Sequence, residues 1–139
     1  MNKDKDTFVG YGKKFQESVA RLMMEDRPFC DQITEVLELE FFDSAYLRAF
    51  VEIILNYREK YNQHPHFATL HTEIKKGNKN YDGAVNKQLR DFLVRIQSDD
   101  VTDKQYIKDQ AIDFCKKQCL KKAILESANL VKKGNYDSI

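Results

Sequence analysis

The sequence contains few residues that would break a helix. Only two prolines and five glycines occur among its 139 residues. No stretch alternates apolar and polar residues, which is the pattern of a half-buried strand. Apolar residues instead recur at spacings of three and four, as they do on one face of a helix. We therefore predict an all-α protein.

Other absences argue against whole classes of protein. No apolar run approaches the roughly 20 residues that a membrane-spanning helix needs, and residues 1–6 do not resemble a signal peptide. The three cysteines are odd in number and form no disulfide framework, so we expect reduced thiols in the cytoplasm. The 23 basic and 22 acidic residues nearly cancel, which argues against a general binder of polyanions.

Apolar spacing and turn signals predict a compact head of about five helices in residues 12–100. The five predicted segments are 15–23, 29–37, 47–61, 67–74 and 85–96. Pro28 precedes the second helix, Gly77 ends the fourth, and Asp82 can cap the fifth. Residues 1–11 are expected to form a flexible tail.

The segment 102–134 is predicted to be one long helix. Thr102 and Gln105 have the spacing of a capping box, and Gly134 suits a left-handed C-terminal position. A helix of this size would be roughly 48 Å long, far above the mean for globular proteins. Its second half carries an apolar stripe that needs a partner helix, formed by Leu120, Ile124, Ala128 and Val131. We predict that this stripe is an oligomer interface and that the function is assembly.

The same helix offers an alternative function. It is rich in lysine, and Lys116, Lys117, Lys121 and Lys122 are the candidate nucleic-acid contacts. No aromatic side chains interleave with these lysines, and no arginine accompanies them for bidentate base contacts. A solvated helix face or one side of a subunit interface is favoured, with a helical DNA-binding module as the alternative.

The sequence predicts no catalytic residue, no cofactor and no metal site. The glycines at 10 and 12 precede Lys13 and Lys14 without the spacing of a phosphate-binding loop. Cys115 and Cys119 are four residues apart and could offer two thiolates to a metal, but packing as small apolar side chains is favoured. The three histidines, His64, His66 and His71, surround Pro65, which favours a structural turn.

In the order and spacing of its elements the chain resembles the N-terminal domain of DnaB-type replicative DNA helicases, and it is most similar to those of T-even-type phages. The resemblance rests on the helix and acidic turn at 19–26 followed by Phe29, the junction at 39–42 leading into 47–54, the Tyr to Pro connection at 57–65, and the long helix at 106–118. It spans roughly residues 12–139.

The resemblance implies a non-catalytic domain that takes part in DNA replication. Such a domain has a helical head and a helical hairpin, and the domains form a collar above the ATPase motor of a hexamer. The motor is not in this chain. Residues 102–139 would be the first hairpin arm and the start of a missing second arm. The implied partners are a second copy, primase and a helicase loader, with weak or no DNA contact and no membrane. A phage protein of this kind would act in the host cytoplasm.

Overall fold

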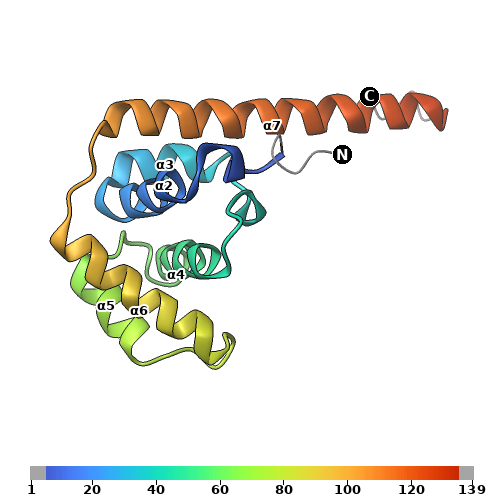
Figure 1. The fold of residues 1–139 in the computed structure, drawn as a ribbon. Coiled ribbons are helices and arrows are strands. Elements are labelled where there is room, and N and C mark those ends of the chain that lie inside the picture. Colours follow the sequence, from blue (N-terminus) through green and yellow to red (C-terminus); the bar gives the residue numbers. More distant parts are fainter. Residues whose placement is uncertain (1–5, 135–139) are drawn as a thin grey trace.

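A computed structural model describes residues 6–134, and no strand occurs in that range. The α-helices are α2 (Lys13–Glu25), α3 (Arg27–Thr34), α4 (Ala45–Tyr61), α5 (Phe67–Lys75), α6 (Gly83–Ser98) and α7 (Lys104–Lys132). Two short 3-10 helices are η1 (Phe8–Tyr11) and η2 (Leu39–Phe41). The all-α prediction is confirmed, and so is the head of five helices followed by one long helix (Figure 1).

One hydrophobic core holds the head together. Helix α4 packs between α2 and α6, and α5 packs on α6. Helix α7 lies across α2 and α3, on the opposite side of the molecule from α5 and α6 (Figure 1). The largest fully buried side chains include Phe8, Phe42, Phe50 and Phe92. Burial of aromatic rings of this size supplies much of the driving force for folding.

Several predicted helix ends are confirmed. The Asp82 carboxylate accepts a hydrogen bond from the Val85 amide at 2.9 Å, which caps α6. Gly77 follows α5 with φ +76°, and Gly134 follows α7 with φ +81°. Both conformations are left-handed and favour glycine. Asp26 caps α3 in the same way as Asp82 caps α6, through the Phe29 amide at 3.0 Å.

The capping box predicted at Thr102 is wrong. Helix α7 begins at Lys104, and its N-cap residue is Asp103, which has φ +55° and makes no capping bond with its side chain. The chain must turn from α6 into α7 within five residues, and Val101 is buried in that turn. The left-handed residue sets the direction of α7 in place of a side-chain cap. With 29 residues, α7 is about 43 Å long.

The predicted boundaries at the start of the head and at the end of α3 are also wrong. Residues 7–11 are not a flexible tail, because Phe8 is fully buried and η1 is ordered around it. Residues 1–5 lie outside the described range. Helix α3 ends at Thr34, so Val36 and Leu37 pack on the core from a non-helical segment.

Candidate functional site

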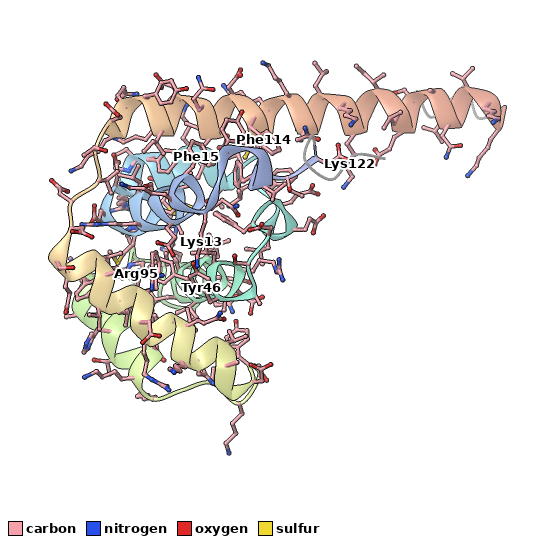
Figure 2. The ribbon with its side chains drawn as sticks, viewed as in Figure 1. Lys13, Phe15, Tyr46, Arg95, Phe114 and Lys122 are labelled. Atoms are coloured by element: carbon pink, nitrogen blue, oxygen red, sulfur yellow. The ribbon has the colours of Figure 1, made fainter. Side chains whose placement is uncertain are left out.

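The first half of α7 is fastened to the head by an aromatic cluster. Ala111, Phe114 and Cys115 are its buried residues. Phe114 lies on the side of α7 that faces the head (Figure 2). Its ring lies 4.9 Å from the Phe8 ring and 5.4 Å from the Phe41 ring, measured between centroids. Three elements distant in sequence therefore meet at Phe114. This contact decides where α7 lies on the head.

Ion pairs extend the attachment along the helix. Lys108 pairs with Asp26, and this hydrogen bond lowers the pKa of the Asp26 carboxyl. Lys122 pairs with Glu38 at 3.1 Å, and the hydrogen bond to that carboxylate raises the pKa of Lys122. Beyond Lys122, no ion pair or ring contact of the described residues joins α7 to the head.

The second half of α7 extends beyond the head (Figure 1). Large apolar side chains on it are exposed: Leu120 by 62%, Ile124 by 58% and Val131 by 46%. Ala128 is exposed as well. All four residues of the predicted stripe are thus exposed to solvent in the structure.

This stripe faces away from the head. Leu120 follows the buried Ala111 by nine residues, which is about two and a half helical turns, so the two side chains leave opposite sides of α7. Ile124 and Val131 follow Leu120 by four and eleven residues and lie on the same side. The apolar face is therefore not a continuation of the contact with α2 and α3, and the head leaves it accessible.

The spacing on this face is that of a coiled-coil seam. Leu120, Ile124, Ser127 and Val131 are separated by four, three and four residues, which is the alternation of a heptad repeat. Ala123 and Ala128 flank the seam and are exposed. Small side chains at flanking positions allow a second helix to approach closely. We call Leu120, Ile124, Ser127 and Val131 the α7 seam.

A groove of about 590 Å³ runs along the opposite side of the overhanging helix. Leu125 and Phe41 line it, together with charged side chains of α7 and the head. Leu125 is 58% exposed and was not part of the predicted stripe. Its position follows from the direction in which α7 leaves the head, which apolar spacing does not reveal.

The four candidate DNA-contacting lysines do not form one free basic face. Lys121 and Lys122 reach back to Asp6 and Glu38. Lys117 pairs with Asp113 on α7 itself at 3.0 Å. Lys116 lines a separate groove between α3 and α7. Three of the four cations already have a carboxylate partner, which does not favour phosphate binding by this set. The DNA-binding alternative stays a prediction.

The histidine turn has a structural role. The carbonyl of Met24 can only accept, so His64 donates to it from Nε2 at 2.6 Å. The neutral ring then accepts at Nδ1 from the Arg58 guanidinium at 2.7 Å. His64 thus links α4 to the end of α2, as the prediction of a structural turn requires.

The two α7 cysteines have different surroundings. Cys115 is fully buried, and burial raises the pKa of its thiol to about 12. Cys119 is exposed, so the prediction that both thiols pack is wrong for Cys119. The helix has begun to leave the head at that point. Among residues 6–134, no three His, Cys, Asp or Glu side chains are placed to share a metal ion.

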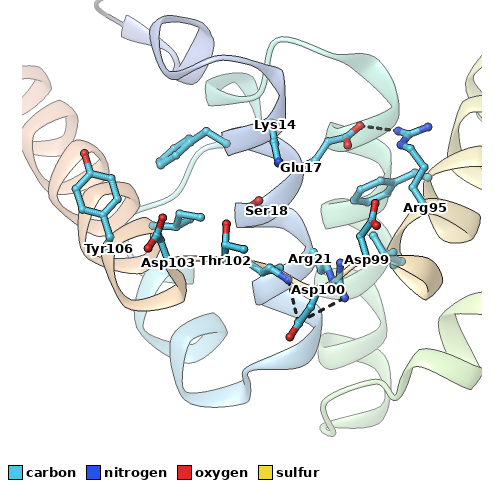
Figure 3. Close-up of a pocket in the computed structure, with 15 residues that line it drawn as sticks. Lys14, Glu17, Ser18, Arg21, Arg95, Asp99, Asp100, Thr102, Asp103 and Tyr106 are labelled. Carbon is cyan, nitrogen blue, oxygen red and sulfur yellow. Dashed lines mark hydrogen bonds and ion pairs between the residues drawn. The ribbon is translucent and has the colours of Figure 1, made fainter.

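A pocket of about 380 Å³ lies where α2, α6 and the start of α7 meet (Figure 3). Glu17 accepts a hydrogen bond from Arg95 at 2.5 Å, and Arg21 lies 4.0 Å from Asp100. Tyr46 also donates to Glu17, and the pKa of Tyr46 is raised chiefly by burial and further by this hydrogen bond. These charged groups pair with one another across the junction, so they join α2, α4, α6 and the link before α7.

Within residues 6–134, no helix combines the length and the apolar character that crossing a membrane requires. Comparisons of the chain with protein-family models, with curated proteins and with solved structures gave no match.

Proposed function

We propose that this chain is a non-catalytic assembly domain whose α7 seam packs against the same helix of a second copy. The observation that carries the proposal is the position of the seam. Three of its four residues are large and apolar, and the seam is exposed, spaced as a heptad, and directed away from the head that holds the helix. A helix face of this kind is stabilised by a partner helix.

The energetics favour a weak contact between two copies. Full burial of a large aliphatic side chain contributes about 1.5–3 kcal/mol. Leu120, Ile124 and Val131 are each exposed by about half, so the six side chains of two copies together supply about 5–10 kcal/mol. Association costs roughly 4–15 kcal/mol in lost translational and rotational freedom. The two ranges overlap, so the seam alone gives a reversible dimer. Further contacts are needed for a permanent one.

The resemblance gives the proposal its specific form. We infer that the chain is a collar domain of a DnaB-type replicative DNA helicase and acts in the cytoplasm during DNA replication. Its partners would be primase and a helicase loader. The full assembly would be a hexamer. The support is the order of elements, which is a five-helix head followed by one long helix that leaves it. ATP hydrolysis would belong to a separate motor, because this sequence has no phosphate-binding loop.

The double variant Leu120→Glu with Ile124→Glu tests the proposal. Two charges in the seam oppose its burial. At high salt, where contacts between surface charges are screened, the variant should therefore sediment as a monomer at concentrations where the wild type associates. Its helical circular dichroism should stay close to that of the wild type, because neither side chain packs on the head.

A matched control places the same charges on the other side of the helix. Leu125→Glu with Asn129→Glu lies on the side of the groove and should associate like the wild type. The proposal fails if the wild type is a monomer at high concentration, or if the control dissociates as fully as the seam variant.

A further inference from the structure

The charged residues of the head are segregated along the chain. Residues 31–47 contain five acidic residues and neither lysine nor arginine. Residues 74–90 contain five basic residues and one acidic residue, Asp82, which caps α6. The net charge of +1 therefore conceals two edges of opposite sign.

The acidic edge lies on the link between α3 and α4. It consists of Glu35, Glu40 and Asp43, all exposed. The other two acids of the segment are already in ion pairs, Asp31 with Arg58 and Glu38 with Lys122. None of the three edge carboxylates is in an ion pair within residues 6–134.

The basic edge lies on α5, α6 and the turn between them, at the end of the molecule farthest from α7 (Figure 1). It consists of Lys75, Lys79, Lys87 and Arg90, all exposed and none in an ion pair within the described range. The fifth cation of the segment, Lys76, lies 3.4 Å from Glu73 on the same helix.

The turn that presents Lys79 is held in one shape. The Asn86 side chain donates to the carbonyls of Asn78 at 3.1 Å and Tyr81 at 3.2 Å. The Asn78 amide donates back to the Asn86 side chain at 3.3 Å. The basic edge is therefore a surface of defined shape, which lowers the entropic cost of binding a partner.

The two edges do not meet within one molecule. No ion pair among the described residues joins them. Elsewhere in the chain, opposite charges pair across elements, as Lys121 does with Asp6 and Lys122 with Glu38. Within the described residues, neither edge has its complement in the same molecule.

We propose that the acidic edge of one copy docks on the basic edge of a second copy. Three free carboxylates on one edge match four free cations on the other, and complementary charge of this kind speeds association and sets its register. Nucleic acid is a poorer match. Tyr81, the aromatic residue of the turn, is half-buried and donates to Glu52, so it offers no free ring to a base.

This contact goes beyond the α7 seam and does not depend on it. The seam joins a helix to its own copy, whereas the edges join unlike surfaces of two heads. Two different contacts on one chain can link copies into an assembly larger than a dimer.

The test is a charge swap carried out in the seam variant Leu120→Glu with Ile124→Glu, where only the head contact operates. One triple reverses the acidic edge: Glu35→Lys, Glu40→Lys and Asp43→Lys. The other reverses the basic edge: Lys75→Glu, Lys79→Glu and Lys87→Glu. All six side chains are exposed, and circular dichroism checks that each variant folds.

At low salt the parent should self-associate in sedimentation velocity. Each triple variant alone should associate at least about tenfold more weakly than the parent. An equimolar mixture of the two triples should regain association, and high salt should abolish it. A parent that stays monomeric at low salt, or a mixture that stays monomeric, overturns the proposal.

A matched control separates the edge from net charge. The control is one triple variant that combines Lys14→Glu, Lys116→Glu and Lys132→Glu. It has the same net charge as the basic-edge triple and leaves both edges intact. This control should associate like the parent, and equal weakening would overturn the proposal. Binding of a labelled DNA oligonucleotide that the basic-edge triple abolishes, without self-association of the parent, would also overturn it in favour of nucleic acid.

Discussion

Asp26 serves two parts of the fold with one carboxylate. One oxygen accepts from the Phe29 amide and caps α3, and the other pairs with Lys108 of α7. The pKa of the Asp26 carboxyl is lowered chiefly by the hydrogen bond from Lys108. The charged form of Asp26 is therefore more favourable in the folded state than in the unfolded chain. The stability that the Asp26–Lys108 pair contributes to the packing of α7 consequently depends on pH.

Replacing Asp26 should separate these two contributions. Asp26→Asn keeps an oxygen for the cap and loses the ion pair, whereas Asp26→Ala loses both, at an additional cost of about 1 kcal/mol for the cap. The stability from the ion pair is present above the ordinary aspartate pKa of 3.8 and is lost as pH falls through the lower folded value. In urea unfolding at pH 7, the free energy of unfolding should thus be highest for the wild type, lower for Asp26→Asn and lowest for Asp26→Ala.

The difference in free energy of unfolding between the wild type and Asp26→Asn should become smaller when urea unfolding is measured below pH 3.8. The gap between Asn and Ala should not, because the cap accepts through an oxygen that does not titrate in the Asn variant. An equal gap between wild type and Asn at both pH values would show that the Lys108 pair contributes nothing.

At the scale of elements, the helices with long apolar periodicity were predictable, and so were their ends marked by Asp82, Gly77 and Gly134. Phe8 was missed because one buried ring in a four-residue 3-10 helix has no period to detect. The capping box at Thr102 failed because a turn constrained by burial of Val101 overrode a local signal. The stripe on α7 was predictable from spacing alone.

Other parts of the site were not predictable, because they depend on where the head holds α7. Lys121 and Lys122 reach Asp6 and Glu38 across more than 80 residues of sequence. No local pattern contains those partners. The direction of the seam, away from the head, depends in the same way on Phe114 meeting Phe8 and Phe41.

The two halves of α7 should respond differently to a glycine. Ala123 is exposed in the overhanging half, so Ala123→Gly should reduce helical circular dichroism in the monomer, at a local cost of about 1 kcal/mol. The unfolding midpoint of the head should stay unchanged, because that half has no core contact. Ala111→Gly in the packed half should reduce the free energy of unfolding by at least about 1 kcal/mol and so lower the unfolding midpoint. Equal shifts of the midpoint would mean that the overhang unfolds together with the head.

At the scale of the whole molecule, the head and the overhang divide the work. The head positions one long helix through a ring cluster and ion pairs. The overhang exposes an apolar face, which we propose packs on a second copy. The head also carries two edges of opposite charge that could join further copies. The central claim is that the exposed seam of α7 is covered in the assembled protein.

Amide hydrogen exchange of the wild type, followed by mass spectrometry over a range of protein concentrations, tests this claim most directly. Amides of residues 120–132 should exchange more slowly as concentration rises, because pairing stabilises a stretch of helix that contributes no buried side chain to the core. Amides of residues 104–118 should change little, since the head already protects them. Exchange in residues 120–132 that is the same at every concentration would contradict the account.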